Sequence, residues 1–126
     1  SVTIGNSVTS IGDRAFEDCY RLTSVTIGDS VTTIGNYAFQ LCVNLREIKL
    51  PAGLKAISKY TFYNCVRLTD VVIPKSVTSI GEHAFAACND LENVYYAGSE
   101  SAWQRVTVEK GNTPLTNADI SYNSSK

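Results

Sequence analysis

Methionine is absent from the 126 residues, and histidine and tryptophan occur once each. A single histidine cannot supply a metal site built from several imidazole ligands. Lys and Arg number 11 against 12 Asp and Glu, so the chain lacks the basic excess that neutralises nucleic-acid phosphates. No apolar run approaches the roughly 18 residues of a membrane-spanning helix. Because an open reading frame begins with methionine, its absence leads us to expect a segment of a longer protein.

The chain is dominated instead by a repeat of about 23 residues. Its most regular columns are Cys19, Cys42, Cys65 and Cys88; Phe16, Phe39, Phe62 and Phe85; and Leu22, Leu45, Leu68 and Leu91. One such unit cannot bury its own apolar face, whereas stacked copies can, so the period predicts a solenoid. We expect a solenoid over residues 1–98, with about four coils of which the first is truncated, and a C-terminal capping segment over residues 99–126.

Each coil is expected to contain three segments. Residues 22–27 are rich in β-branched side chains and alternate at their end, which predicts a short strand. A second extended piece, residues 31–34, ends at Gly35. In residues 36–42 the apolar side chains recur at i and i+3 or i+4, which predicts one or two helical turns. The period and these segments give the fold class, a leucine-rich repeat solenoid with a parallel sheet on its concave face.

The segment Ser7–Cys19 and its three later copies resemble the BspA-like branch of leucine-rich repeat proteins, over residues 1–98. The stretch from Tyr95 to Leu115 resembles a segment that often closes such arrays in gut Firmicutes. The resemblance implies secreted or surface-anchored proteins, often large and modular, of host-associated bacteria and some parasitic protists. Their proposed roles are adhesion to host or matrix proteins and to other cells, and no shared catalytic residue comes with the family.

One departure from the general leucine-rich pattern concerns the position that follows the strand and its turn. The Asn or Cys expected there is replaced by Ser30, Gly53 or Ser76. Ligand sites of other leucine-rich families therefore cannot be transferred to this chain.

The N-terminal end lies inside a repeat whose opening leucine is missing. Solenoids normally begin with a cap that shields the first coil and its open strand edge. We therefore expect further repeats, or another domain, to precede residue 1 in the parent protein.

The C-terminal segment breaks the period. Ser99 or Ser101 can cap a short helix over residues 102–105, and Ser101 followed by Gln104 fits a capping box. Residues 118–122 are expected to form a last strand, and 124–126 a frayed end or the start of a linker.

The final coil needs a cover for its apolar face. The candidates are Trp103, Val106, Val108 and Leu115. A role of Trp103 in stacking on a ligand is the alternative.

The four cysteines do not suit a zinc site. Coils of a parallel sheet stack about 4.8 Å apart, so Cys19 and Cys88 should lie roughly 14 Å apart and cannot meet at one ion. Disulfides between neighbouring coils are disfavoured, because residues in register point their Cβ atoms the same way. We expect buried free thiols that pack as small hydrophobic groups, and no cofactor.

Catalysis has no candidate constellation in the sequence. His83 shares its column with Arg14, Tyr37 and Tyr60, which suggests an exposed position without a partner for a Ser-His-Asp or Cys-His site. The acidic residues are scattered, and no glycine-rich phosphate loop occurs. We expect that the chain is not an enzyme.

The concave face is the surface that the repeat predicts for binding. Two outward columns line it, and their more distinctive members are Glu47, Asp70 and Asn93 in one and Lys49, Val72 and Tyr95 in the other. An exposed aromatic beside an aliphatic residue is suited to a partner contact. Alternatively, Tyr95 only packs beside the cap. The column of Tyr37, Tyr60 and His83 on another face is a second, weaker candidate.

These observations predict a non-enzymatic protein-interaction or adhesion module of a secreted or cell-surface protein. Its partner would be a protein or a glycan, bound through the concave face by extended complementarity, with no nucleic acid bound and no membrane insertion in this segment. The alternative is a structural spacer that presents another domain of a larger surface protein.

Overall fold

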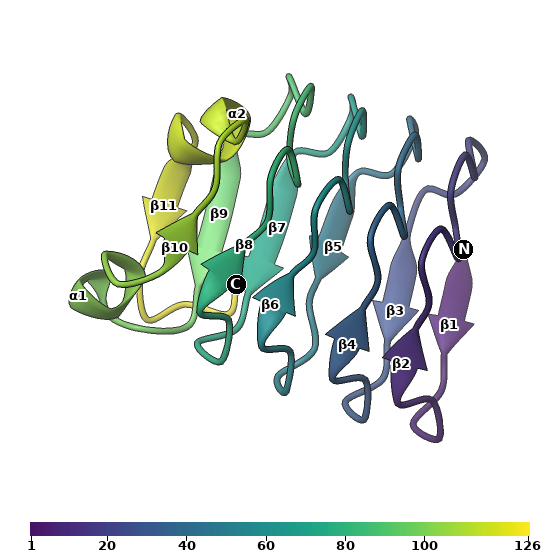
Figure 1. Cartoon of the computed structure of the whole chain (residues 1–126), viewed down its shortest axis with the longest axis horizontal. Helices are drawn as coiled ribbons and strands as arrows, with labels where there is room; N and C mark the ends of the chain where they lie inside the picture. The colour runs from purple at the N-terminus through teal and green to yellow at the C-terminus, as the bar shows by residue number, and fades with distance from the viewer.

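The coils stack side by side along the molecule, and their strands stand in two rows (Figure 1). This computed structural model describes all 126 residues. The first row contains β1 (Val2–Ile4), β3 (Val25–Ile27), β5 (Glu47–Lys49), β7 (Asp70–Ile73), β9 (Asn93–Tyr96) and β11 (Asp119–Ser121). The second row contains β2 (Ser10–Ile11), β4 (Thr33–Ile34), β6 (Ala56–Ile57), β8 (Ser79–Ile80) and β10 (Thr107–Val108). Two short helices, α1 (Glu100–Trp103) and α2 (Thr113–Thr116), lie near the C-terminal end of the stack.

Neighbouring strands pair in parallel at the step of the repeat. Val25 lies opposite Val2, and Val71 lies between Ile48 and Val94. Equivalent side chains of successive coils therefore stack on one another. This arrangement confirms the predicted solenoid with parallel strands and a regular repeat.

The strand ladder is interrupted in each row, between β3 and β5 and between β4 and β6. Just after β3, the N–H of Gly28 donates to the carbonyl of Ile4 at 2.8 Å. Pro51 occupies the equivalent position after β5 and has no N–H, so the carbonyl of Ile27 receives no such bond. Pro74 removes the same bond one coil later, where β5 and β7 stay paired. The proline therefore weakens the junction of β3 and β5 without being sufficient to interrupt a ladder.

The phenylalanine column forms a continuous stack through the core. The ring centroids of Phe16, Phe39, Phe62 and Phe85 are separated in turn by 5.2, 5.6 and 5.3 Å, with nearly parallel planes. Offset stacking at this spacing is favourable for aromatic rings. Since identical residues repeat at identical positions, each ring packs against its own copy in the next coil.

The third segment of each coil differs from the expected helical turn. Tyr37 and Leu41 have φ values of 61° and 62°, in the left-handed region that a right-handed helix cannot include. The N–H groups of Tyr37, Phe39 and Leu41 donate to the next coil, whereas those of Gln40 and Cys42 donate to Tyr37 and Phe39 within the same coil. The prediction of a helix is therefore wrong here, and a series of tight turns replaces it. Such turns also bring every third or fourth side chain to the core, so the spacing of apolar residues does not separate the two structures.

The cysteine column is buried and hydrogen-bonded. The Sγ atoms of Cys42, Cys65 and Cys88 each donate to the carbonyl oxygen of a phenylalanine in the preceding coil, at 3.1–3.2 Å. Burial raises the pKa of Cys42 and of Cys88 from 9.0 to about 12, and raises that of Cys65 well above its usual value. Cys19 lies in the first coil and is only half-buried. The expected packing role thus holds for three of the four thiols.

Residues 99–126 add one strand to each row, although the period is stretched. Asp119 pairs with Asn93, and Thr107 pairs with Ser79, and both steps are longer than the repeat. The Oγ of Ser99 accepts from the N–H of Ala102, so Ser99 and not Ser101 caps α1. The last strand forms over Asp119–Ser121, within the predicted range of 118–122.

Asn112 occupies a position that sequence reasoning missed. In the earlier coils the N–H of the core phenylalanine donates to a backbone carbonyl of the next coil, as that of Phe62 does to Ala84. For Phe85 the acceptor is the side-chain Oδ1 of Asn112, at 3.0 Å. The Nδ2 of Asn112 donates to the carbonyls of Gly81 and Glu109. A buried amide side chain thus replaces the backbone of a further coil at this point.

We predict that Asn112→Ala lowers the free energy of unfolding by about 2–3 kcal/mol, because it leaves the buried N–H of Phe85 without an acceptor. Urea denaturation followed by circular dichroism measures this loss. Asn117→Ala is the matched control, since Asn117 is exposed and its side chain has no hydrogen bond in the structure. Equal losses for the two variants would contradict the role given to Asn112.

We also predict that Ellman's reagent at pH 8 labels Cys19 in the folded protein, and Cys42, Cys65 and Cys88 only after unfolding. The unfolded state loses thiol protons above pH 9, whereas the folded state keeps them until about pH 12. The free energy of unfolding should therefore fall as the pH rises through this window, and fall less steeply in Cys88→Ala. Rapid labelling of all four thiols in the native state would show that the column is not closed to solvent.

Candidate functional site

The outward surface of the first row of strands, predicted to be concave, is called the sheet face. Strand register places Glu47, Asp70, Asn93 and Asp119 in one column of it. The adjacent outward column contains Lys49, Val72, Tyr95 and Ser121. All six residues that the sequence analysis selected thus lie on this one surface.

The six residues differ in how much of each side chain solvent can reach. Glu47 and Lys49 are exposed, and Asp70, Asn93 and Tyr95 are half-buried. Val72 is only 6% exposed, which corrects the expectation that it offers an open apolar contact. It is flanked in register by Lys49 and Tyr95, whose longer side chains stand on either side of it.

The C-terminal residues lie on the sheet face and do not form the frayed end that the sequence suggested. Asn123, whose φ is 53°, turns the chain after β11. Its N–H donates to the carbonyl of Gly98 at 2.8 Å, and that of Ser124 donates to the carbonyl of Tyr96 at 3.0 Å. Residues 123–126, called the tail, are thereby tied to the end of β9.

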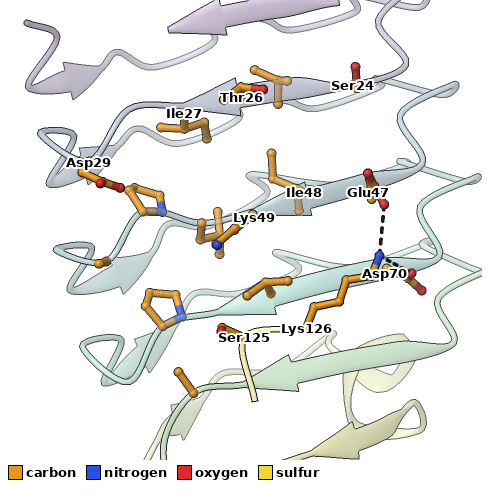
Figure 2. A pocket seen from close by; sticks show the side chains of 17 residues that line it. Ser24, Thr26, Ile27, Asp29, Glu47, Ile48, Lys49, Asp70, Ser125 and Lys126 are labelled. Atoms are coloured by element: carbon orange, nitrogen blue, oxygen red, sulfur yellow. Dashed lines mark hydrogen bonds and ion pairs between the residues drawn. The ribbon is translucent and has the colours of Figure 1, made fainter. Parts of the chain in front are cut away.

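Lys126 at the end of the tail joins two carboxylates of the sheet face (Figure 2). Its Nζ donates to Oε2 of Glu47 at 3.2 Å and to Oδ2 of Asp70 at 3.0 Å, and it lies 5.8 Å from the ring centroid of Tyr95. The hydrogen bond to Asp70, followed by that to Glu47, raises the pKa of the Lys126 ammonium above its usual value.

A groove of about 750 Å³ opens beside this ion pair, where β3 and β5 are not joined in one ladder. Strands β3, β5 and β7 and the tail line it, as Figure 2 shows. Thr26, Asp29 and Lys49 contribute polar groups to its wall, and Ile27 and Ile48 contribute apolar surface. A groove with charges of both signs around an apolar floor is suited to an extended polypeptide.

The other face singled out by sequence carries a short aromatic ladder. Tyr37 stacks on Tyr60 with ring centroids 5.0 Å apart, and His83 lies tilted against Tyr60 at 5.1 Å. The Arg14 guanidinium lies 4.1 Å from the Tyr37 ring centroid. His83 is half-buried, not exposed as expected, because Gly111 packs against its imidazole ring. A side chain at Gly111 would collide with that ring, so the ladder is part of the packing of the last coils.

Comparison with known families agrees with this architecture. The model of the BspA-type leucine-rich repeat region, in 6 copies, matches residues 1–107. The chain belongs to this family. No curated protein sequence matches this BspA-type chain.

Solved structures of bacterial leucine-rich repeat proteins are similar to this BspA-type chain. A protein from Bacteroides ovatus has a TM-score of 0.74 at 28% identity, and the match covers 95% of this chain and 30% of that one. The leucine-rich repeat protein of T. pallidum gives 0.70 at 28% identity, over 93% and 64% of the two chains. A leucine-rich cell-surface protein from Faecalibacterium prausnitzii gives 0.66 at 32% identity, over 86% and 35%. The chain thus spans less than two thirds of each of these proteins.

Neither of the two helices in this BspA-type chain has the length and apolar sequence required to cross a bilayer.

We predict that the ε-methylene protons of Lys126 and the ring protons of Tyr95 give nuclear Overhauser contacts, and that Asp70→Asn together with Glu47→Gln removes them. The double variant keeps the shape of both side chains but abolishes the charge attraction. The amide of Ser124 should stay protected from hydrogen exchange in this variant, because its acceptor is the backbone of Tyr96. Loss of both signals together would mean that the ion pair alone holds the tail.

Proposed function

We propose that this chain is the protein-interaction module of a secreted or cell-surface bacterial protein, and that it binds its partner through the sheet face. The observation that carries the proposal is the groove on that face, whose wall combines charged side chains of both signs with apolar surface. Family membership and the cell-surface relative from Faecalibacterium prausnitzii support the class and the location.

The physical basis of such binding is a rigid, regular surface. Strands held in register by neighbouring coils display side chains at fixed spacing. Binding therefore costs little free energy for ordering the side chains of the site. Extended surfaces of this kind are what stacked repeats use for recognition. Leucine-rich repeats are in general an interaction fold and not a catalytic one, which agrees with the expected absence of enzymatic activity.

A spacer role is the second candidate. The relatives are longer than this chain, which spans 30%, 64% and 35% of them. Stacked coils with a continuous core resist bending, so the same stack can hold another domain at a distance from the cell surface.

We predict that Lys49→Glu weakens binding to a partner by about tenfold. A partner surface that complements the positive charge of Lys49 would be repelled by a glutamate at the same position. Biolayer interferometry against a panel of purified extracellular-matrix proteins measures the effect. Lys59→Glu is the matched control, because Lys59 is also exposed but lies in the turn segment and does not line the groove.

Two outcomes would contradict the proposal. If no member of the panel binds the unmodified chain, the spacer role is favoured. If Lys49→Glu and Lys59→Glu bind equally well, the partner does not use the sheet face.

A further inference from the structure

Glu47 and Asp70 lie directly opposite each other on β5 and β7. Like charges in such a cross-strand pair repel and destabilise a sheet. The structure relieves this repulsion by placing one ammonium group between Oε2 of Glu47 and Oδ2 of Asp70. A cation at this point therefore offsets a repulsion that the strand register creates.

Neighbouring side chains shape this acidic pair into a seat for one group. The Nδ2 of Asn93 donates to Oδ1 of Asp70 at 3.1 Å, which orients the carboxylate and leaves Oδ2 for the ammonium. The ring of Tyr95 adds its face to the same position, 5.8 Å from Nζ. Four of the six residues that sequence selected thus act on a single charge: Glu47, Asp70, Asn93 and Tyr95.

The occupant of the seat is held loosely. The tail is tied to β9 through the backbone of Asn123 and Ser124, whereas Lys126 reaches the carboxylates by its side chain alone. That side chain remains 44% exposed, and exposed ion pairs contribute little to stability. A competing cation can therefore displace Lys126 without disturbing the coils.

We propose that Glu47, Asp70, Asn93 and Tyr95 form a seat for a lysine side chain on an extended segment of the partner protein, and that Lys126 occupies this seat until the partner displaces it. The inference rests on the proposed interaction function and adds the chemistry of the partner. A lysine fits because its compact ammonium carries three donors, enough to bond both carboxylates at once. The adjoining groove, whose wall includes Ser125, offers room of about 750 Å³ for the main chain beside that lysine.

The test uses the full chain and two synthetic peptides. Acetyl-Asn-Ser-Ser-Lys-amide is titrated into the ¹⁵N-labelled wild type and into Lys126→Ala, with the amides of Asp70 and Tyr95 as reporters. If Lys126 fills the seat about nine-tenths of the time, its removal lowers the apparent Kd about tenfold. Acetyl-Asn-Ser-Ser-Gln-amide, which lacks the charge, should give no saturable shift.

Variants of the seat in the Lys126→Ala background provide the second arm. Glu47→Gln with Asp70→Asn should abolish binding of the lysine peptide, whereas Glu109→Gln should leave it unchanged. Glu109 is exposed and lies outside the groove, so its variant is matched in charge to Glu47→Gln alone, which is titrated beside it. Thermal unfolding of each variant verifies that the coils remain folded, and Glu47→Gln alone, at an exposed position, serves if the double variant unfolds.

The proposal is overturned if wild type and Lys126→Ala bind the lysine peptide equally, if the glutamine peptide binds as well, or if Glu109→Gln weakens binding as much as the seat variants do. Failure of this inference is distinguishable from failure of the proposed function. A partner whose binding is lost in Lys49→Glu but kept in Glu47→Gln with Asp70→Asn would uphold the sheet face and reject the lysine seat.

Discussion

The in-register contact between successive coils is the constraint on which the structure depends. Backbone hydrogen bonds along the strands and through the turn segments hold each residue beside its equivalent in the next coil. Every core side chain must therefore pack well against its own equivalent. Phenylalanine meets this requirement by offset stacking. Cysteine meets it by donating a hydrogen bond from its thiol to a backbone carbonyl of the preceding coil. The same constraint buries Cys42, Cys65 and Cys88 and raises their pKa values.

The distinctive features of the surface and of the C-terminal end occur where a residue does not pack well against its equivalent in the next coil. Pro51 removes a bond between coils, and the groove opens beside that junction, where β3 and β5 are not paired. Glu47 opposite Asp70 places like charges in register, and Lys126 compensates them. Phe85 has no regular coil beyond it, and Asn112 supplies the missing acceptor. In the last two cases a side chain from outside the repeat completes what a neighbouring coil provides elsewhere, and on the sheet face that addition is exchangeable.

Several elements could be predicted because positions that stay apolar in every repeat are the buried ones. The strands, the core columns and the two outward columns follow from which positions keep apolar side chains at each step. The turn segment could not be identified, since left-handed residues such as Tyr37 and Leu41 are not ones that favour this conformation by themselves. Neighbouring coils impose the left-handed conformation, because their carbonyl groups accept hydrogen bonds from every second N–H of the turn segment. Asn112 gave no signal either, because a single amide outside the period resembles any loop residue.

The sequence alone determined the period, the parallel strands, the identity of the core and the surface that carries Glu47, Lys49, Asp70, Asn93 and Tyr95. Each of these depends on a pattern that recurs in every coil, so the copies support one another. Only the tertiary structure decided that Val72 is nearly buried, that a groove opens between β3 and β5, and that the tail lies on the sheet face. Lys126 and Glu47 are 79 residues apart in the sequence, and the contact between them has no equivalent in the other coils. A contact made once leaves no period in the sequence, and it exists only because the stacked coils bring the two residues together.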